Sequence, residues 1–76
     1  MNFESMSKND YRAYIIDTTG INRINAEAFA TLYDNRERAT PQFMKGLGDF
    51  VHHANRNTIV DMDVQLAFDK LRHLLI

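Results

Sequence analysis

A chain of 76 residues suffices for one small domain, and 45% hydrophobic with 25% charged residues is the composition of a globular protein rather than a disordered one. Nine Lys and Arg against ten Asp and Glu leave a net charge of -1, which excludes a general basic field that would gather nucleic acid. The sequence has no cysteine and no apolar run near the roughly 20 residues that span a bilayer, so disulfides, a thiol nucleophile and a membrane-spanning helix are excluded. We expect a soluble, intracellular protein that oligomerises, because so small a core needs a further source of stability.

The first helix is predicted within residues 8–20, where apolar residues recur at helical spacing and a glycine follows the last of them. Ser7 or Asn9 would cap its beginning. We expect residues 1–7 to form a flexible N-terminal end and residues 8–76 to form the single domain.

A loop with a brief extended piece is predicted for residues 21–25, and Asn25 is a good N-cap for a central helix that begins at Ala26. Steps of three, four and seven place the apolar residues of this helix on one face, which we call the apolar stripe. The stripe consists of Phe29, Leu32, Tyr33, Phe43, Met44, Leu47, Phe50, Val51 and Ala54. The remaining segments are too short to cover it, so we expect a second subunit to lie across it.

Pro41 interrupts the central pattern, because it lacks the amide that would bond to the carbonyl of Glu37. Either one long helix is kinked near residues 37–40, or it breaks and a new helix starts with Thr40 as its cap and Pro41 in its first turn. The apolar stripe keeps its phase across the proline, so we favour one kinked helix.

Residues 55–60 predict a turn that leads into a short extended piece at residues 58–60. A last helix would begin at Asp61 or Asp63. Its inward residues would be Val64, Ala67, Phe68, Leu71, Leu74 and Leu75.

Two segments carry a resemblance to histones. HANRNTIVDMDVQLAF, residues 53–68, resembles the end of the histone fold of core and archaeal histones, where a His-Ala pair, a basic residue, Thr, Asp and a Val-x-x-Ala helix follow at this spacing. GINRIN, residues 20–25, resembles the first histone loop, with Arg23 in the place of its arginine. The resemblance implies an all-α histone fold of a short, a long and a short helix. Two such chains pair head to tail in a handshake dimer, so that each first loop lies beside the partner's second loop. The implied dimer interface includes Phe29, Phe43, Leu47 and Phe50.

Two further contacts follow from the resemblance. Arg56 would clamp the second loop by bonding to Asp63, seven residues on; the alternative is a pair of solvated surface charges. His53 would reach Asp63 of a neighbouring dimer, in a contact made with Phe50 and Leu66. The alternative for His53 is a helix-end histidine with no partner beyond its own helix.

The resemblance also implies contact with duplex DNA, with an arginine toward the minor groove and the paired loops toward phosphates. The candidate residues are Arg23, Arg56, Asn57 and Thr58, with Lys8 and Arg12 in place of the basic residues that the family carries on its first helix. Alternatively, Arg23 bonds within its own loop and Thr58 caps a turn. Asn57 stands where the family usually has a second basic residue, so we expect weak and salt-sensitive binding.

No catalytic set of residues is visible, so we expect neither an enzyme nor a cofactor. His52 and His53 are adjacent and would point about 100° apart on a helix, so we expect no metal site; a surface pair of Asp49 with His53 is the plainer interpretation.

Two functions of different class remain. The first is a small histone-like protein, associated with DNA in a nucleus, nucleoid or virion, that dimerises and binds or bends duplex DNA without sequence preference; further assembly of its dimers is left open. The second is a histone-fold subunit that pairs with a different histone-fold chain in a transcription or chromatin complex and makes little DNA contact. The loop arginines favour the first, and the charge balance with Asn57 favours the second.

Overall fold

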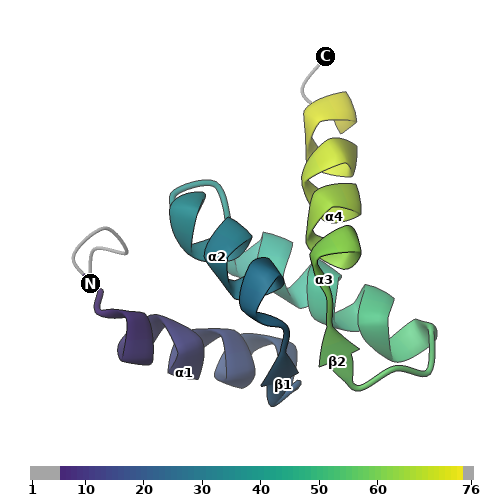
Figure 1. The fold of residues 1–76 in the computed structure, drawn as a ribbon. Coiled ribbons are helices and arrows are strands. Elements are labelled where there is room, and N and C mark those ends of the chain that lie inside the picture. The colour runs from purple at the N-terminus through teal and green to yellow at the C-terminus, as the bar shows by residue number, and fades with distance from the viewer. Residues whose placement is uncertain (1–5, 75–76) are drawn as a thin grey trace.

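The computed structural model describes residues 6–74, with side chains through residue 72, and this part of the chain is mostly helical (Figure 1). It contains four α-helices and one short pair of parallel strands, which agrees with the predicted all-α class. In chain order the elements are α1 (Lys8–Thr19), β1 (Arg23–Ile24), α2 (Ala26–Asp34), α3 (Pro41–His53), β2 (Thr58–Ile59) and α4 (Asp61–Leu74).

Helix α1 begins and ends where local chemistry directs it. The Ser7 hydroxyl accepts a hydrogen bond from the backbone N–H of Asp10 at 3.1 Å, and Gly20 ends the helix with a left-handed φ of 74°. Both predicted ends are therefore confirmed. The prediction of a flexible end at residues 1–7 is wrong for its last two residues, because Met6 packs in the core at 9% exposure and Ser7 caps α1. Residues 1–5 of that prediction lie outside the described residues.

The prediction of one kinked central helix is wrong. Helix α2 ends at Asp34 and α3 starts at Pro41, with the Thr40 hydroxyl accepting from the backbone N–H of Phe43 at 3.2 Å. Proline fits the first turn of a helix, where its missing N–H costs nothing, and a threonine before it supplies the cap. The alternative interpretation, a break with Thr40 as cap, is confirmed.

The break divides the chain into two helix–strand–helix units. The first unit consists of α1, β1 and α2, and the second of α3, β2 and α4 (Figure 1). Across the units α1 packs on α3 and α2 packs on α4. The strands pair in parallel, with Arg23 opposite Thr58 and Ile24 opposite Ile59. The first and second loops of one chain therefore lie side by side.

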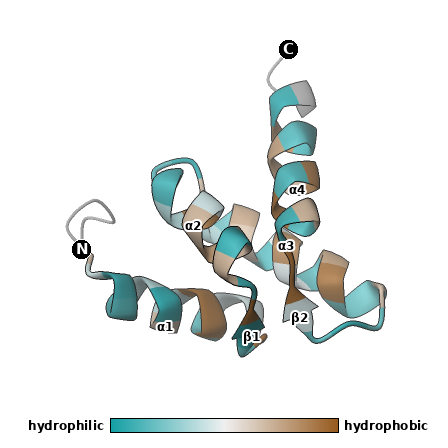
Figure 2. Ribbon diagram, in the orientation of Figure 1, coloured by the Kyte–Doolittle hydropathy of each residue, from teal (hydrophilic) through white to brown (hydrophobic). Residues whose placement is uncertain are grey.

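The two units cover one shared core, and Figure 2 shows hydrophobic positions on all four helices. Leu32, Met44 and Val51 are fully buried and Leu47 is 1% exposed. The expectation that this chain cannot cover its own apolar stripe is therefore wrong, because the break lets α2 and α3 face the same core. Of the four residues expected at a dimer interface, Phe29 and Leu47 are buried by their own chain, Phe43 is half-buried and Phe50 is exposed.

Helix α4 presents its predicted face to the core. Val64 and Phe68 are buried, and Ala67 and Leu71 pack against them as half-buried residues. The side chain of Leu74, and Leu75 as a whole, lie outside the described residues.

The end of α1 approaches the middle of α3 at a glycine. A Cβ atom on Gly48 would lie 2.8 Å from the carbonyl oxygen of Thr19 and 2.9 Å from its Cα. Beside this contact, the Nε2 atom of His52 lies 3.2 Å from the same carbonyl oxygen. Only a residue without a side chain permits this helix–helix distance.

Candidate nucleic-acid interface

The strand pair gathers four of the six predicted DNA-contact residues at one edge of the molecule. Arg23 in β1 lies opposite Thr58 in β2, and Arg56 and Asn57 occupy the turn immediately before β2. Arg23, Arg56 and Asn57 are exposed, and Thr58 is half-buried. We call these four residues the loop site.

The structure does not bring the other two predicted residues to the loop site. Lys8 and Arg12 lie in the first half of α1, about 12 to 18 Å along the helix axis from the end that leads into β1. Their charged groups lie over aromatic rings: Lys8 Nζ is 5.7 Å from the ring centre of Tyr33, and Arg12 Cζ is 4.5 Å from that of Phe29. These cation–π contacts give both side chains a local role in holding α1 against α2.

The predicted clamp between Arg56 and Asp63 is present. The Nη1 atom of Arg56 donates to Oδ2 of Asp63 at 2.9 Å, and Nη2 donates to the other carboxylate oxygen. The backbone N–H of Val60 also donates to Oδ2, at 3.1 Å. Because the Asp63 residue is only 2% exposed, the alternative of two solvated charges is wrong, and the pair fixes the turn that carries Arg56 and Asn57.

Electrostatics keep both members of the clamp charged. Burial raises the pKa of Asp63, but the hydrogen bonds from Arg56 and Val60, together with the charge of Arg56, outweigh it and hold the pKa below its usual value. The hydrogen bond to Asp63 raises the pKa of Arg56 in turn. The Arg56 side chain is still 39% exposed, so guanidinium N–H groups beyond the two in the clamp face solvent.

Arg23 has a different environment. Among the residues that the structure describes, its side chain makes no hydrogen bond or ion pair, although its backbone belongs to the strand pair. The alternative in which Arg23 bonds within its own loop is therefore wrong for the described part of the chain. An exposed guanidinium without a carboxylate neighbour is free to bind an anion such as a phosphate.

Only some of the residues expected at a dimer–dimer contact are exposed and could make it. Phe50 and Leu66 are 45% and 50% exposed, and His53 is exposed as well. Asp63, in contrast, is buried and already accepts three hydrogen bonds from its own chain. A contact there would rest on the first three residues, and it stays a prediction. The interpretation of Asp49 and His53 as a surface pair is wrong, because no ion pair joins these two described residues.

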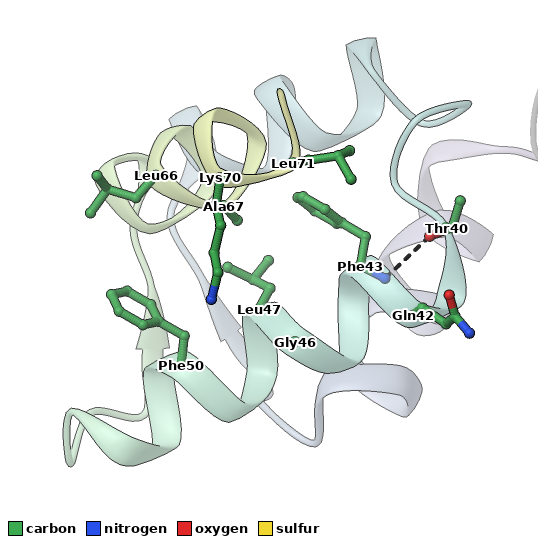
Figure 3. A pocket seen from close by; sticks show the side chains of 10 residues that line it. All are labelled: Thr40, Gln42, Phe43, Gly46, Leu47, Phe50, Leu66, Ala67, Lys70 and Leu71. Atoms are coloured by element: carbon green, nitrogen blue, oxygen red, sulfur yellow. Dashed lines mark hydrogen bonds between the residues drawn. The ribbon is translucent and has the colours of Figure 1, made fainter. Parts of the chain in front are cut away.

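Sequence reasoning missed a groove of about 540 Å³ between α3 and α4 (Figure 3). It is lined by Thr40, Gln42, Phe43, Gly46, Leu47, Phe50, Leu66, Ala67, Lys70 and Leu71. The helical periodicity predicts an inward-facing position for Phe43, Leu47, Phe50, Ala67 and Leu71, but the spacing between two helices depends on how they pack and cannot be read from either helix alone.

Among residues 6–74, no cluster of three or more His, Asp or Glu side chains could hold a metal ion. The described helices are all too short or too polar to cross a membrane. Comparisons with protein families, with curated proteins and with solved structures find no match to this chain.

Proposed function

We propose that this chain is a histone-like architectural protein that binds duplex DNA through the loop site without reading its sequence. The observation that carries the proposal is the register of the parallel strands, which sets Arg23 opposite Thr58 with Arg56 and Asn57 beside them. Paired loops with exposed arginines and a hydroxyl are the arrangement that the resemblance to histones leads one to expect.

Each group at the loop site has a chemistry suited to the DNA backbone. Arg23 offers an exposed guanidinium that has no side-chain partner among the described residues, and such a group suits phosphate oxygens or a minor groove. Arg56 adds a second cation whose position is fixed by Asp63. The Thr58 hydroxyl and the Asn57 amide donate neutral hydrogen bonds to phosphate. None of these contacts distinguishes one base pair from another unless a side chain reaches base edges.

The charge balance sets the strength of binding. With a net charge of -1 and two arginines at the loop site, one chain neutralises few phosphates. Because the logarithm of the affinity falls with the logarithm of the salt concentration in proportion to that number, binding is weak and is lost early as salt rises.

A salt titration of duplex binding, followed by fluorescence anisotropy, tests the proposal. Arg23→Ala is expected to weaken binding to all duplexes alike and to reduce the salt slope by about 0.9, the value of one phosphate contact. Arg72→Ala removes the same charge from an exposed position far along α4 and serves as the control. No binding at low salt, or equal losses in the two variants, would refute the loop site.

We further propose that two chains form the handshake dimer by exchanging units. The main contacts between the first and second unit, α1 on α3, α2 on α4 and β1 with β2, join residues on opposite sides of the connection at residues 35–40. The second unit of another chain can make the same contacts, so the exchange preserves the native core and costs little. A dimer of this kind carries two copies of the loop site.

The exchange predicts a dependence on the length of the connection. Sedimentation equilibrium of the wild type is expected to show a mass rising with concentration from 8.8 kDa toward twice that value. Two glycines inserted between Glu37 and Arg38, both exposed, ease closure within one chain and shift the equilibrium to monomer. A wild type that stays at the mass of one chain at every concentration would exclude the exchange, while leaving the loop site to its own test.

The second candidate function is a histone-fold subunit that pairs with a different chain. The near-neutral charge of the sequence and the neutral Asn57 favour it. In that case the purified chain would not bind duplex even at low salt, and a distinct histone-fold chain would replace the second unit in the exchanged dimer.

A further inference from the structure

The groove between α3 and α4 is a surface feature that the loop site does not use. It lies on the far side of α3 from α1, and its apolar side chains come from both walls. Figure 3 shows Phe50 and Leu66 facing each other across one end, with Phe43 and Leu71 near the other end. Phe50 and Leu66 are among the few large apolar side chains that the described chain leaves about half exposed.

The groove is preformed in this fold. The ring of Phe43 stacks on the ring of Phe68 with centres 4.5 Å apart, so the wall that Phe43 makes is held from behind. Leu47, at the bottom, is only 1% exposed and belongs to the core. A ligand would therefore meet a fixed apolar surface, and little ordering of side chains would be needed.

The dimensions of the groove fit a helix. Its α3 wall runs from Thr40 to Phe50, which is about 15 Å of helix, or about three turns. An amphipathic helix laid in such a groove buries side chains spaced three, four and seven residues apart.

Gly46, which lines the same groove, also bears on what could lie against α3. A glycine inside a helix costs about 1 kcal/mol relative to alanine, and a conformational or packing reason usually accounts for it. Within the part of the chain that the structure describes, Gly46 has no such reason, because a Cβ atom there would meet nothing within 4 Å and its φ is not in the left-handed region. It lies in the groove wall, where the missing side chain lets the backbone of another helix come close (Figure 3).

The charge of the groove indicates the chemistry of its occupant. Lys70 is the single charged residue among those that line it, and no carboxylate is present there. In Figure 3 its side chain extends from α4 across the groove toward α3. Among the described residues Lys70 makes no ion pair. A ligand carboxylate placed beside this exposed ammonium group would gain an oppositely charged partner at the groove.

We propose that the groove between α3 and α4 binds an amphipathic helix of a partner protein, with apolar side chains on one face and a carboxylate that pairs with Lys70. The groove shares no residue with the loop site, which lies at the strand pair.

A selection from displayed helical peptides tests the proposal with the full chain as bait. A random library of peptides of about 14 residues, four helical turns, is expected to yield sequences with an apolar stripe and at least one Asp or Glu on its border. The strongest peptide is then synthesised with a fluorescent label, and its affinity is measured by anisotropy. A selection that yields no binder, or binders rich in Lys and Arg, would overturn the proposal.

Two pairs of variants locate the peptide. Gly46→Leu places a side chain in the groove at a position where a Cβ atom meets no described atom within 4 Å, and it is expected to weaken binding by roughly tenfold or more. Lys45→Leu adds the same side chain one residue away, outside the groove, and should leave the affinity within about twofold. Lys70→Glu should lower the affinity for the selected peptide and raise the affinity for a variant of that peptide in which Lys replaces the acidic residue. Equal binding to Gly46→Leu and Lys45→Leu would place the peptide elsewhere.

A second copy of this chain is the competing occupant, and sedimentation distinguishes it. Three results together would assign the groove to a second copy: the wild type associates, Gly46→Leu is monomeric, and the selected peptides do not displace the associated copy. In that case the proposal is wrong. Duplex binding by Gly46→Leu is expected to match the wild type, so failure of the groove leaves the loop site standing.

Discussion

The close approach of α1 to α3 can be tested with two glycines of the same helix. Gly46 and Gly48 both lie inside α3, two residues apart. A Cβ atom on Gly46 meets nothing within 4 Å, whereas one on Gly48 lies 2.8 Å from the carbonyl oxygen of Thr19. Gly46→Ala and Gly48→Ala therefore share one change in helix propensity and differ in the space available.

The expected magnitudes follow from these two terms. Alanine in place of glycine stabilises a helix interior by about 1 kcal/mol, so Gly46→Ala should raise the free energy of unfolding by about that amount. At Gly48 the atoms in the way belong to the backbone of Thr19, which cannot move without shifting α1. Such overpacking typically costs about 1 to 3 kcal/mol, which cancels or exceeds the gain. The free energy of unfolding of Gly48→Ala should therefore be about 1 to 3 kcal/mol lower than that of Gly46→Ala.

Urea denaturation followed by circular dichroism measures this difference directly. In a domain of this size 1 kcal/mol corresponds to about 4 to 8 °C in Tm, so thermal unfolding gives an independent value. Equal stabilisation by the two substitutions would show that α1 does not pack on α3 at Gly48, and the arrangement of the two units would then be wrong. Both variants are measured at the same low protein concentration, so that dimerisation does not contribute to the difference in the free energy of unfolding.

Two further predictions concern titrating groups. Asp63→Asn leaves Arg56 without its carboxylate and should lower the free energy of unfolding by about 2 kcal/mol in urea. Because the folded pKa of Asp63 lies below its usual value, the wild type keeps this contribution to the free energy of unfolding above about pH 4 and loses it as the pH falls through the folded pKa. The free energy of unfolding of Asp63→Asn should therefore fall less at acid pH. An equal fall at acid pH in the wild type and in Asp63→Asn would contradict the clamp. Burial, the largest cause, raises the pKa of Tyr11 to about 12, so the folded state resists ionisation of a phenol that ionises near pH 10 when unfolded. Stability should therefore fall between pH 10 and 12 by about 2 to 3 kcal/mol, and Tyr11→Phe should flatten that fall; an equally steep fall in Tyr11→Phe would count against the burial of this residue.

The ends of the elements could be predicted from sequence because local chemistry decides them. Ser7 and Asn25 were recognisable caps, Gly20 was a recognisable stop, and each performs that role. The short extended pieces beside Arg23 and Thr58 were also predicted, since β-branched residues flank turn-forming ones there.

The break in the central helix could not be predicted from the phase of the apolar stripe. The phase of the apolar stripe across Pro41 indicated continuity, but two helices that face one shared core keep such a phase as well as one helix does. The capping chemistry of Thr40 and the position of Pro41 were the better guides, because they act on the residues at the junction itself. The expectation that short remaining segments cannot cover the apolar stripe assumes one continuous helix, and the break between α2 and α3 removes that assumption.

The candidate site divides in the same way. The spacing of Arg56 and Asp63 predicted a contact within one loop and the start of one helix, and that contact is present. Lys8 and Arg12 were assigned to the DNA surface by analogy alone, and their distance from the loop site depends on the direction of α1, which no local signal reveals. The groove beside Gly46 and Lys70 was missed for a similar reason, because it exists only between two packed helices.

The loop site is the central claim, and NMR of the isotope-labelled chain with a short duplex at low salt tests it most directly. The amide signals of residues 21–25 and 55–60 are expected to shift first and most, with those of Arg23 and Asn57 among them, and the shifts should reverse as salt is added. Absence of any shift, or shifts confined to the first half of α1 or to the end of α4, would contradict the claim.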